Sequence, residues 1–210
     1  MKILALDISS HCGWALLETV GNDELPKLLE YETVHLGQTV FEVSDHYPTN
    51  YRMASGLMGQ KIVDIVTKTR PDVIVIEEIN KAKNRWSQKY LDWIHIKFLD
   101  LLIEKYPQYL SKNLFYIDSS QWRKVLGIQL TKEDKKKNAI ISKAKNISVD
   151  KLKEVKKTTG IKGKVNKKHV AVRWVNEKYN LTLKQKDNDL AEAACLGIAY
   201  ALGAKTCNGK

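Results

Sequence analysis

The apolar residues in the first forty positions of the chain form three short runs that are typical of β-strands. Residues 2–8 are almost wholly apolar and contain one acid, and residues 14–20 and 28–38 are two further strand-like stretches. Gly21 and Pro26 lie in the polar segment that separates the second stretch from the third. This spacing predicts an antiparallel meander of three strands.

After the meander the period of the apolar positions changes from that of a strand to that of a helix. Residues 49–69 carry apolar side chains mostly three or four positions apart and stop before Pro71, which predicts a crossover helix. Residues 72–77 then have the character of a buried strand ending in acids, and residues 86–106 form a second amphipathic stripe that ends before Pro107.

The remaining regular elements complete an alternating pattern. Residues 114–118 predict another buried strand, Ser119 or Ser120 can cap a short helix through residue 126, and residues 167–179 and 189–204 predict two more helices. The order favours one α/β domain over residues 1–210, with a mixed sheet flanked by helices. We find no internal repeat and no linker long enough to separate two domains.

Lysines interrupt this pattern between Thr131 and Lys168. That segment holds fourteen lysines against four acids, so it carries a net charge of +10 out of the chain's +11. Thr131 and Asp134 resemble the capped start of a helix, and Gly160 and Gly163 divide the segment. We therefore expect a lysine-rich helical insertion at about residues 131–166, which is either a solvated surface feature or a surface that attracts phosphates.

Composition narrows the class of protein. The chain has 210 residues, of which 43% are hydrophobic and 28% charged, as in an ordinary soluble domain with a sizeable core. It has no apolar run of roughly 18 residues and no secretory signal pattern, so we expect a cytoplasmic protein without a membrane segment. Its three cysteines have no metal-ligand spacing, which predicts reduced thiols and no structural zinc.

Four carboxylates occupy positions that are not typical of solvent-exposed surface residues. Asp7 and Glu77 each end an apolar strand, and Asp189 and Glu192 are three positions apart and so share one helix face. Any one of them could be an ordinary surface acid, but a buried acid is costly unless it is paired or binds a cation. Because carboxylates at close range cannot all stay ionised without positive charge, the set points to Mg²⁺, with Mn²⁺ able to substitute.

Three segments of the chain resemble motifs of the RuvC-like Holliday-junction resolvases, which belong to the ribonuclease H-like superfamily. ILALDISSHCGWAL is similar to the family's first strand and turn and places its metal-binding acid on Asp7 and the following glycine on Gly13. PDVIVIEEINKAKN resembles the second motif, with its acid on Glu77, and DLAEAACLGIA resembles the closing helix, with its acids on Asp189 and Glu192. The resemblance spans the chain except for the basic segment.

The resemblance implies a ribonuclease H-like fold, in which three antiparallel strands are followed by parallel strands, and a Mg²⁺-dependent endodeoxyribonuclease. It implies that Asp7 bridges two ions, that Glu77 and Asp189 hold one each, and that Glu192 completes the site that activates water. Lys167 or Lys168 corresponds to a basic residue that faces the scissile phosphate, and we take Lys167 as the catalytic choice. Asp187 and Glu78 are neighbouring acids that could replace an assigned ligand.

The same resemblance implies branched DNA as the substrate. We expect paired symmetric nicks that leave 5′-phosphate and 3′-hydroxyl ends, made by a homodimer because a four-way junction has two-fold symmetry. Basic residues around the acids would contact the DNA, and the insertion would extend along the junction arms and contact phosphates without reading bases. The expected contact residues are Lys83, Arg85, Lys164, Lys167 and Lys168.

Other functions remain open at this point. The closest alternative is a nuclease of broader selectivity that also cuts flaps and forks, because selectivity depends on dimer geometry and loop shape rather than on the metal ligands. A non-catalytic junction-binding protein is a further alternative. An actin-like ATPase also begins with an apolar strand, an acid and a glycine-bearing hairpin, but the chain lacks the later glycine-rich phosphate loops.

Overall fold

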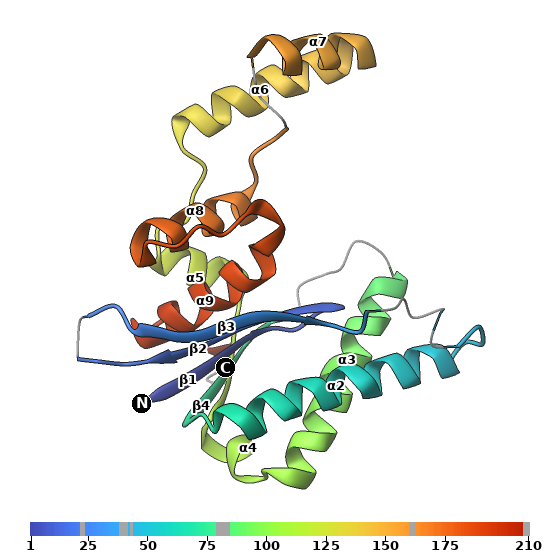
Figure 1. The fold of residues 1–210 in the computed structure, drawn as a ribbon, viewed down its shortest axis with the longest axis vertical. Helices are drawn as coiled ribbons and strands as arrows, with labels where there is room; N and C mark the ends of the chain where they lie inside the picture. The colour runs from blue at the N-terminus through green and yellow to red at the C-terminus, as the bar shows by residue number, and fades with distance from the viewer. Residues whose placement is uncertain (22–23, 38–41, 43, 79–84, 160–162, 208–210) are drawn as a thin grey trace.

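The fold is built on a mixed sheet of five strands in the order β3-β2-β1-β4-β5 (Figure 1). The structure is a computed structural model that describes residues 1–21, 24–37, 42, 44–78, 85–159 and 163–207. Its first three strands are antiparallel neighbours, and the last two run parallel to β1. The strand bounds are β1 Lys2–Asp7, β2 His11–Glu18, β3 Lys27–His35, β4 Val73–Glu77 and β5 Leu114–Ile117.

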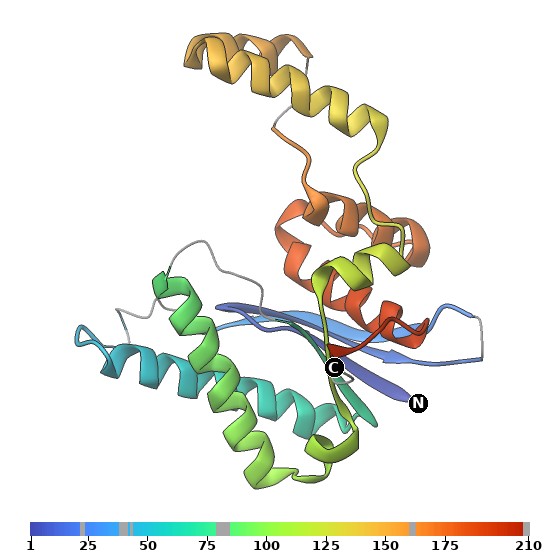
Figure 2. The same ribbon diagram turned by 180° about the vertical axis from the view of Figure 1, so that it is seen from behind.

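The helices lie on both faces of this sheet and in a projection beyond it. Helices α2 and α3 cover one face, α5, α8 and α9 cover the other, and α6 and α7 form a hairpin that projects away from the body (Figures 1 and 2). The bounds are α2 Thr49–Thr69, α3 Arg85–Lys105, α4 Gln108–Lys112, α5 Ser119–Val125, α6 Lys132–Ile147, α7 Val149–Thr159, α8 Lys167–Tyr179, η1 Gln185–Asp187 and α9 Asn188–Ala201.

The central strand β1 is apolar at every inner position because both of its faces are covered. Ile3 and Ala5 pack into the core beneath α8 and α9, whereas Leu4 and Leu6 pack into the core beneath α2 and α3. All four side chains are fully buried. A strand buried on both faces loses the alternation of apolar and polar residues, which explains the continuous run in the sequence.

This architecture confirms the predicted fold class: the mixed ribonuclease H-like sheet with an antiparallel meander, parallel strands and flanking helices. The bounds of α2 and α8 agree with those expected from the apolar pattern. The short helix α4 was not predicted, and α5 is capped by the carboxylate of Asp118, which accepts from the backbone N–H of Ser120, rather than by Ser119 or Ser120. The acid that directly follows β5 therefore caps the next helix.

The cysteines and the helix lengths bear on two further expectations. Cys12, Cys195 and Cys207 are free. Across the described ranges, the structure contains no helix that combines the length and the apolar character needed to cross a membrane.

Two side-chain contacts fix the base of the α6–α7 hairpin to the body. Arg173 of α8 binds both oxygens of Asp134 at 2.6 and 3.0 Å, and its hydrogen bonds hold the pKa of that carboxyl well below its usual range. Asn138 exchanges two hydrogen bonds with the backbone of Val165, at 2.7 and 2.8 Å. Thr131 and Asp134 form the capping box that the sequence predicts. The first two turns of α6 are therefore held in place.

Gly13 allows the backbone of α9 to approach β2 closely. A Cβ atom at position 13 would overlap the backbone carbonyl of Asp189 and crowd the amide of Leu190. Packing therefore requires glycine at position 13. The same packing sets how closely the first turn of α9 approaches the sheet.

We predict that Gly13→Ala destabilises the protein by about 1–3 kcal/mol, because the added methyl has no space and α9 must shift. Gly56→Ala is the matched control: Gly56 lies within α2, a Cβ there would meet nothing within 4 Å, and alanine is the better helix former. Urea unfolding of both variants measures the two free energies. Equal stability of Gly13→Ala and the wild type would contradict the close packing.

Candidate metal centre

Four carboxylates from three elements meet at the carboxyl end of the two central parallel strands. Asp7 and Glu77 are the last residues of β1 and β4, which are hydrogen-bonded neighbours running in the same direction. Asp189 and Glu192 lie in the first turns of α9, which packs across β1 and β2. Asp7, Asp189 and Glu192 each offer an oxygen, and these oxygens lie within 4.8 Å of one another.

Lys168 supplies positive charge to this cluster from the first turn of α8. Its Nζ lies 2.8 Å from Asp189 Oδ1 and 2.8 Å from Glu192 Oε2, and it also donates to Asn188 Oδ1 at 3.0 Å. The Glu192 side chain is only 3% exposed, whereas the Lys168 side chain is 45% exposed. The lysine therefore joins a buried acid to the solvent side of the site.

The short helix α5 binds two of the acids from the opposite side. Trp122 Nε1 donates to Glu77 Oε2 at 3.0 Å, and Arg123 Nη2 donates to Glu192 Oε1 at 2.5 Å. The Arg123 guanidinium also lies 4.4 Å from the centroid of the Trp122 ring, within the range of a cation–π contact. Neighbouring residues of one helix thus orient carboxylates from two other elements.

Burial and mutual repulsion favour protonation of the strand-end acids. Burial, followed by repulsion from Glu77 and Glu192, raises the pKa of Asp7 well above its usual value. Burial and repulsion from Glu192 raise the pKa of Glu77 to about 7, although Arg123 and the hydrogen bond from Trp122 oppose the shift. Burial alone would lower the pKa of Lys168, but attraction to Glu192 and hydrogen bonds to Asp189 and Glu192 raise it above its usual value.

This donor set fits a hard divalent cation. The clustered ligands are carboxylate oxygens, which Mg²⁺ and Mn²⁺ prefer, and the nearby Cys12 thiol is kept protonated because burial raises its pKa. Burial raises the pKa of Asp7 and of Glu77 most, repulsion between the acids adds to it, and a bound divalent cation would stabilise the ionised carboxylates against both. Asp7, Asp189 and Glu192 are the residues that would hold the ion, with Glu77 beside them.

The predicted basic residues differ in their distance from this cluster. Lys168, rather than Lys167, contacts the acids, and Lys167 in the same helical turn is exposed. Arg85, at the start of α3, and Lys164, in the segment before α8, are also exposed, and Lys83 lies outside the described residues. The lysine that would face a phosphate beside the acids is therefore Lys168.

The two acids that could have replaced a ligand have other surroundings. Asp187 accepts a hydrogen bond from the backbone of Lys184 at 2.8 Å and so closes the turn before α9. Glu78 lines a separate cavity of about 680 Å³ together with Asp118 and Lys205. Among the described residues, neither belongs to the group whose oxygens converge.

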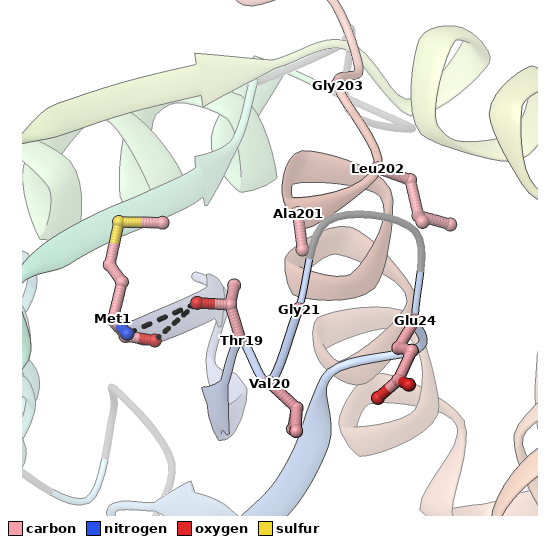
Figure 3. A pocket seen from close by; sticks show the side chains of 8 residues that line it. All are labelled: Met1, Thr19, Val20, Gly21, Glu24, Ala201, Leu202 and Gly203. Atoms are coloured by element: carbon pink, nitrogen blue, oxygen red, sulfur yellow. Dashed lines mark hydrogen bonds between the residues drawn. The ribbon is translucent and has the colours of Figure 1, made fainter.

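A further cavity of about 620 Å³ lies at the opposite end of β1 (Figure 3). Met1, Thr19 and Glu24 line part of it, and the N-terminal amine donates to Thr19 Oγ1 at 3.1 Å. Among the described residues that line it, Glu24 is the one acid, so these residues offer no cluster of ligands. The acids at the carboxyl end of the sheet remain the candidate functional site.

Comparison with solved structures identifies the same fold. Thermus thermophilus RuvC in complex with a Holliday junction substrate matches with a TM-score of 0.61 at 15% identity, covering 98% of this chain and 99% of that one. A second T. thermophilus RuvC structure gives 0.59 at 14% identity with the same coverage. The yeast mitochondrial Holliday junction resolvase gives 0.53 at 13% identity, covering 95% and 77%.

These matches confirm, at the level of the fold, the resemblance to RuvC-like resolvases that the three sequence motifs indicate. No protein-family model matches the chain, and no curated protein sequence is significantly similar to it.

We predict that Trp122→Phe weakens Mn²⁺ binding about tenfold, because it removes the N–H that orients Glu77 while keeping an aromatic ring. Trp14→Phe is the matched control: Trp14 is buried too, but its indole N–H has no partner among the described residues. The electron paramagnetic resonance signal of free Mn²⁺, titrated without DNA, measures both affinities. A loss of similar size in the two variants would mean that the effect comes from packing alone.

We also predict that divalent-cation affinity rises from pH 6 to pH 8. Below a pKa of about 7, Glu77 binds a proton that competes with the cation, so affinity falls by up to about tenfold per pH unit for one competing proton. Titration calorimetry in two buffers of different ionisation enthalpy measures the affinity and the protons released together. An affinity that is constant over this range, with no proton release, would refute the prediction.

Proposed function

We propose that the protein is a metal-dependent, structure-selective endodeoxyribonuclease that resolves four-way DNA junctions. The observation that carries this proposal is the convergence of Asp7, Asp189 and Glu192, with Glu77 beside them and Lys168 across them, on a RuvC-like sheet. The T. thermophilus RuvC structure with the same fold is a complex with a Holliday junction substrate. Junction DNA is therefore the substrate that we infer for this chain.

Each residue of the site has a role in hydrolysis of a phosphodiester. When bound, two Mg²⁺ ions would lower the pKa of the attacking water and neutralise charge on the phosphate. Asp7, Asp189 and Glu192 would bind the ions, and Glu77 would complete the set in the orientation fixed by Trp122. The Lys168 ammonium would donate to the phosphate oxygens as negative charge develops there.

The bond that breaks defines the products. The hydroxyl of water joins phosphorus, the bond between phosphorus and the 3′ oxygen breaks, and that oxygen takes a proton. The ends would be a 5′-phosphate and a 3′-hydroxyl. Lys164, Lys167 and Arg85 would contact the DNA, because they are exposed cations.

A homodimer would place two such sites on the two opposed strands of a junction. Support comes from α2 and α3, which expose apolar side chains on the face turned away from the sheet: Met53 at 48%, Leu57 at 47%, Ile96 at 54% and Ile103 at 47%. Ile96 also lines a shallow groove of about 240 Å³ with Trp93. A surface of this kind is typical of contacts between protein chains.

We predict that the purified protein cuts a labelled four-way junction at two symmetric positions in Mg²⁺ or Mn²⁺ and not in EDTA. Asp7→Asn and Glu77→Gln should lower the cleavage rate more than about 100-fold, because each removes a carboxylate charge from the cluster. Glu78→Gln is the matched control, since Glu78 is the adjacent acid outside the cluster. Gel analysis of end-labelled strands measures rate, symmetry and end chemistry.

The same gels distinguish the alternatives. If a matched fork or flap were cut as fast as the junction, the protein would be a nuclease of broader selectivity for branched DNA rather than a junction resolvase. Tight metal-independent binding with no cleavage in any metal would leave a junction-binding protein. Single, uncoupled nicks would contradict the dimer.

A further inference from the structure

The projecting hairpin carries a row of lysines on one face of α6. Lys136 is four positions after Lys132, and Lys143 is seven positions after Lys136, so these three share one side of the helix. Lys135 lies beside them on the same side. The opposite side of the helix holds the buried residues Asp134, Ile141 and Ala144. We call Lys132, Lys135, Lys136 and Lys143 the α6 lysine stripe; all four are exposed.

The stripe lysines have no counterion among the described residues, unlike three other lysines of the hairpin. Lys137 pairs with Glu133, Lys151 pairs with Glu154, and Lys153 pairs with Asp150. Within the part of the chain that the structure describes, none of the four stripe lysines forms an ion pair. Their positive charges therefore repel one another unless a polyanion is present.

The residue types of the hairpin indicate what kind of polyanion fits. Between Thr131 and Lys168 the chain has no arginine and no aromatic residue. It therefore lacks the planar guanidinium fork that suits bidentate recognition and the rings on which unpaired bases stack. Lysine ammonium groups alone contact phosphates without regard to base sequence. This chemistry suits the backbone of a duplex better than a single strand.

The stripe also has a fixed position relative to the metal centre. Asp134 and Asn138, on the first turns of α6, are bound to Arg173 and to the backbone of Val165. Val165 precedes Asn166, whose side chain caps α8, and α8 carries Lys168 into the metal centre. The hairpin and the catalytic lysine are thus attached to the same helix, so the stripe can hold DNA at a set distance from the acids.

We propose that the α6 lysine stripe is a second, sequence-independent binding surface for double-helical DNA, which engages a duplex arm away from the point where the strands exchange. Lys132 and Lys143 are eleven positions apart, so the helix rises about 16 Å between them, which is the length of about five base pairs. The stripe would add affinity only when a junction arm is long enough to reach it. This inference rests on the proposed function in taking branched DNA as the substrate.

The test compares the full-length protein with a variant carrying Lys132→Gln, Lys135→Gln, Lys136→Gln and Lys143→Gln. A control variant removes the same charge elsewhere, through Lys2→Gln, Lys27→Gln, Lys61→Gln and Lys112→Gln, all exposed positions of the body. Binding in EDTA to four-way junctions with arms from 6 to 25 base pairs is followed by fluorescence anisotropy over a range of salt concentrations.

The wild type and the control variant should bind more tightly as the arms lengthen and then reach a plateau. The stripe variant should lose that increase, bind long-armed junctions at least about tenfold more weakly, and show a salt dependence shallower by up to about 3.6 in log–log slope for four lost phosphate contacts. Equal losses in the stripe and control variants, or a loss independent of arm length, would overturn the proposal.

Two further measurements distinguish duplex binding by the stripe from membrane binding and from the activity of the metal centre. Anionic lipid vesicles that bind the wild type but not the stripe variant, with DNA binding unchanged, would replace duplex DNA by a membrane surface and overturn the proposal. Mg²⁺-dependent cleavage of short-armed junctions tests the metal centre independently of the hairpin. Length-dependent binding without cleavage would refute the nuclease and keep the stripe, whereas cleavage without length-dependent binding would do the reverse.

Discussion

The structure depends above all on the compensation of negative charge buried at the end of the central strands. Glu192 is almost completely enclosed, and both of its oxygens are occupied, one by Arg123 and the other by Lys168. An unpaired carboxylate at that depth would cost several kcal/mol, so loss of either cation would destabilise the packing of α9 against the helix that carries it. The pairing that stabilises the fold therefore also defines the shape of the cation site.

The sheet topology explains why acids so distant in sequence can meet. β1 and β4 are parallel neighbours, so their carboxyl ends reach the same edge and bring Asp7 next to Glu77. α9 crosses the adjacent β2 at Gly13, where the absence of a side chain lets the Asp189 backbone come into contact. The helices α5 and α8 flank α9 and add their cations from either side. The sheet thus places two of the acids, and the helices packed on it place the other two acids and the cations.

The sequence predicted the strand-end acids and the helical acid pair because apolar runs ending in carboxylates are visible in a linear pattern. It left Lys167 and Lys168 unresolved, since adjacent residues of a helix point about 100° apart and the pattern does not fix the rotation of α8. Trp122 and Arg123 were missed because the contact between Arg123 and Glu192 joins residues 69 positions apart with no motif between them. The α6–α7 segment was recognised by charge, but its attachment through Asn138 and Arg173 required the tertiary structure.

The chain order of the ligands has a consequence for biosynthesis. The first candidate ligand is residue 7 and the last is residue 192, and α9 joins them only by docking on strands formed by the N-terminal part of the given sequence. A nascent polypeptide that already contains the meander, α2 and β4 still lacks Asp189 and Glu192, two of the four carboxylates. Cation binding by the full set of carboxylates is therefore withheld until α9 has been synthesised, and any hydrolytic activity that depends on it cannot arise from a nascent chain that lacks this helix.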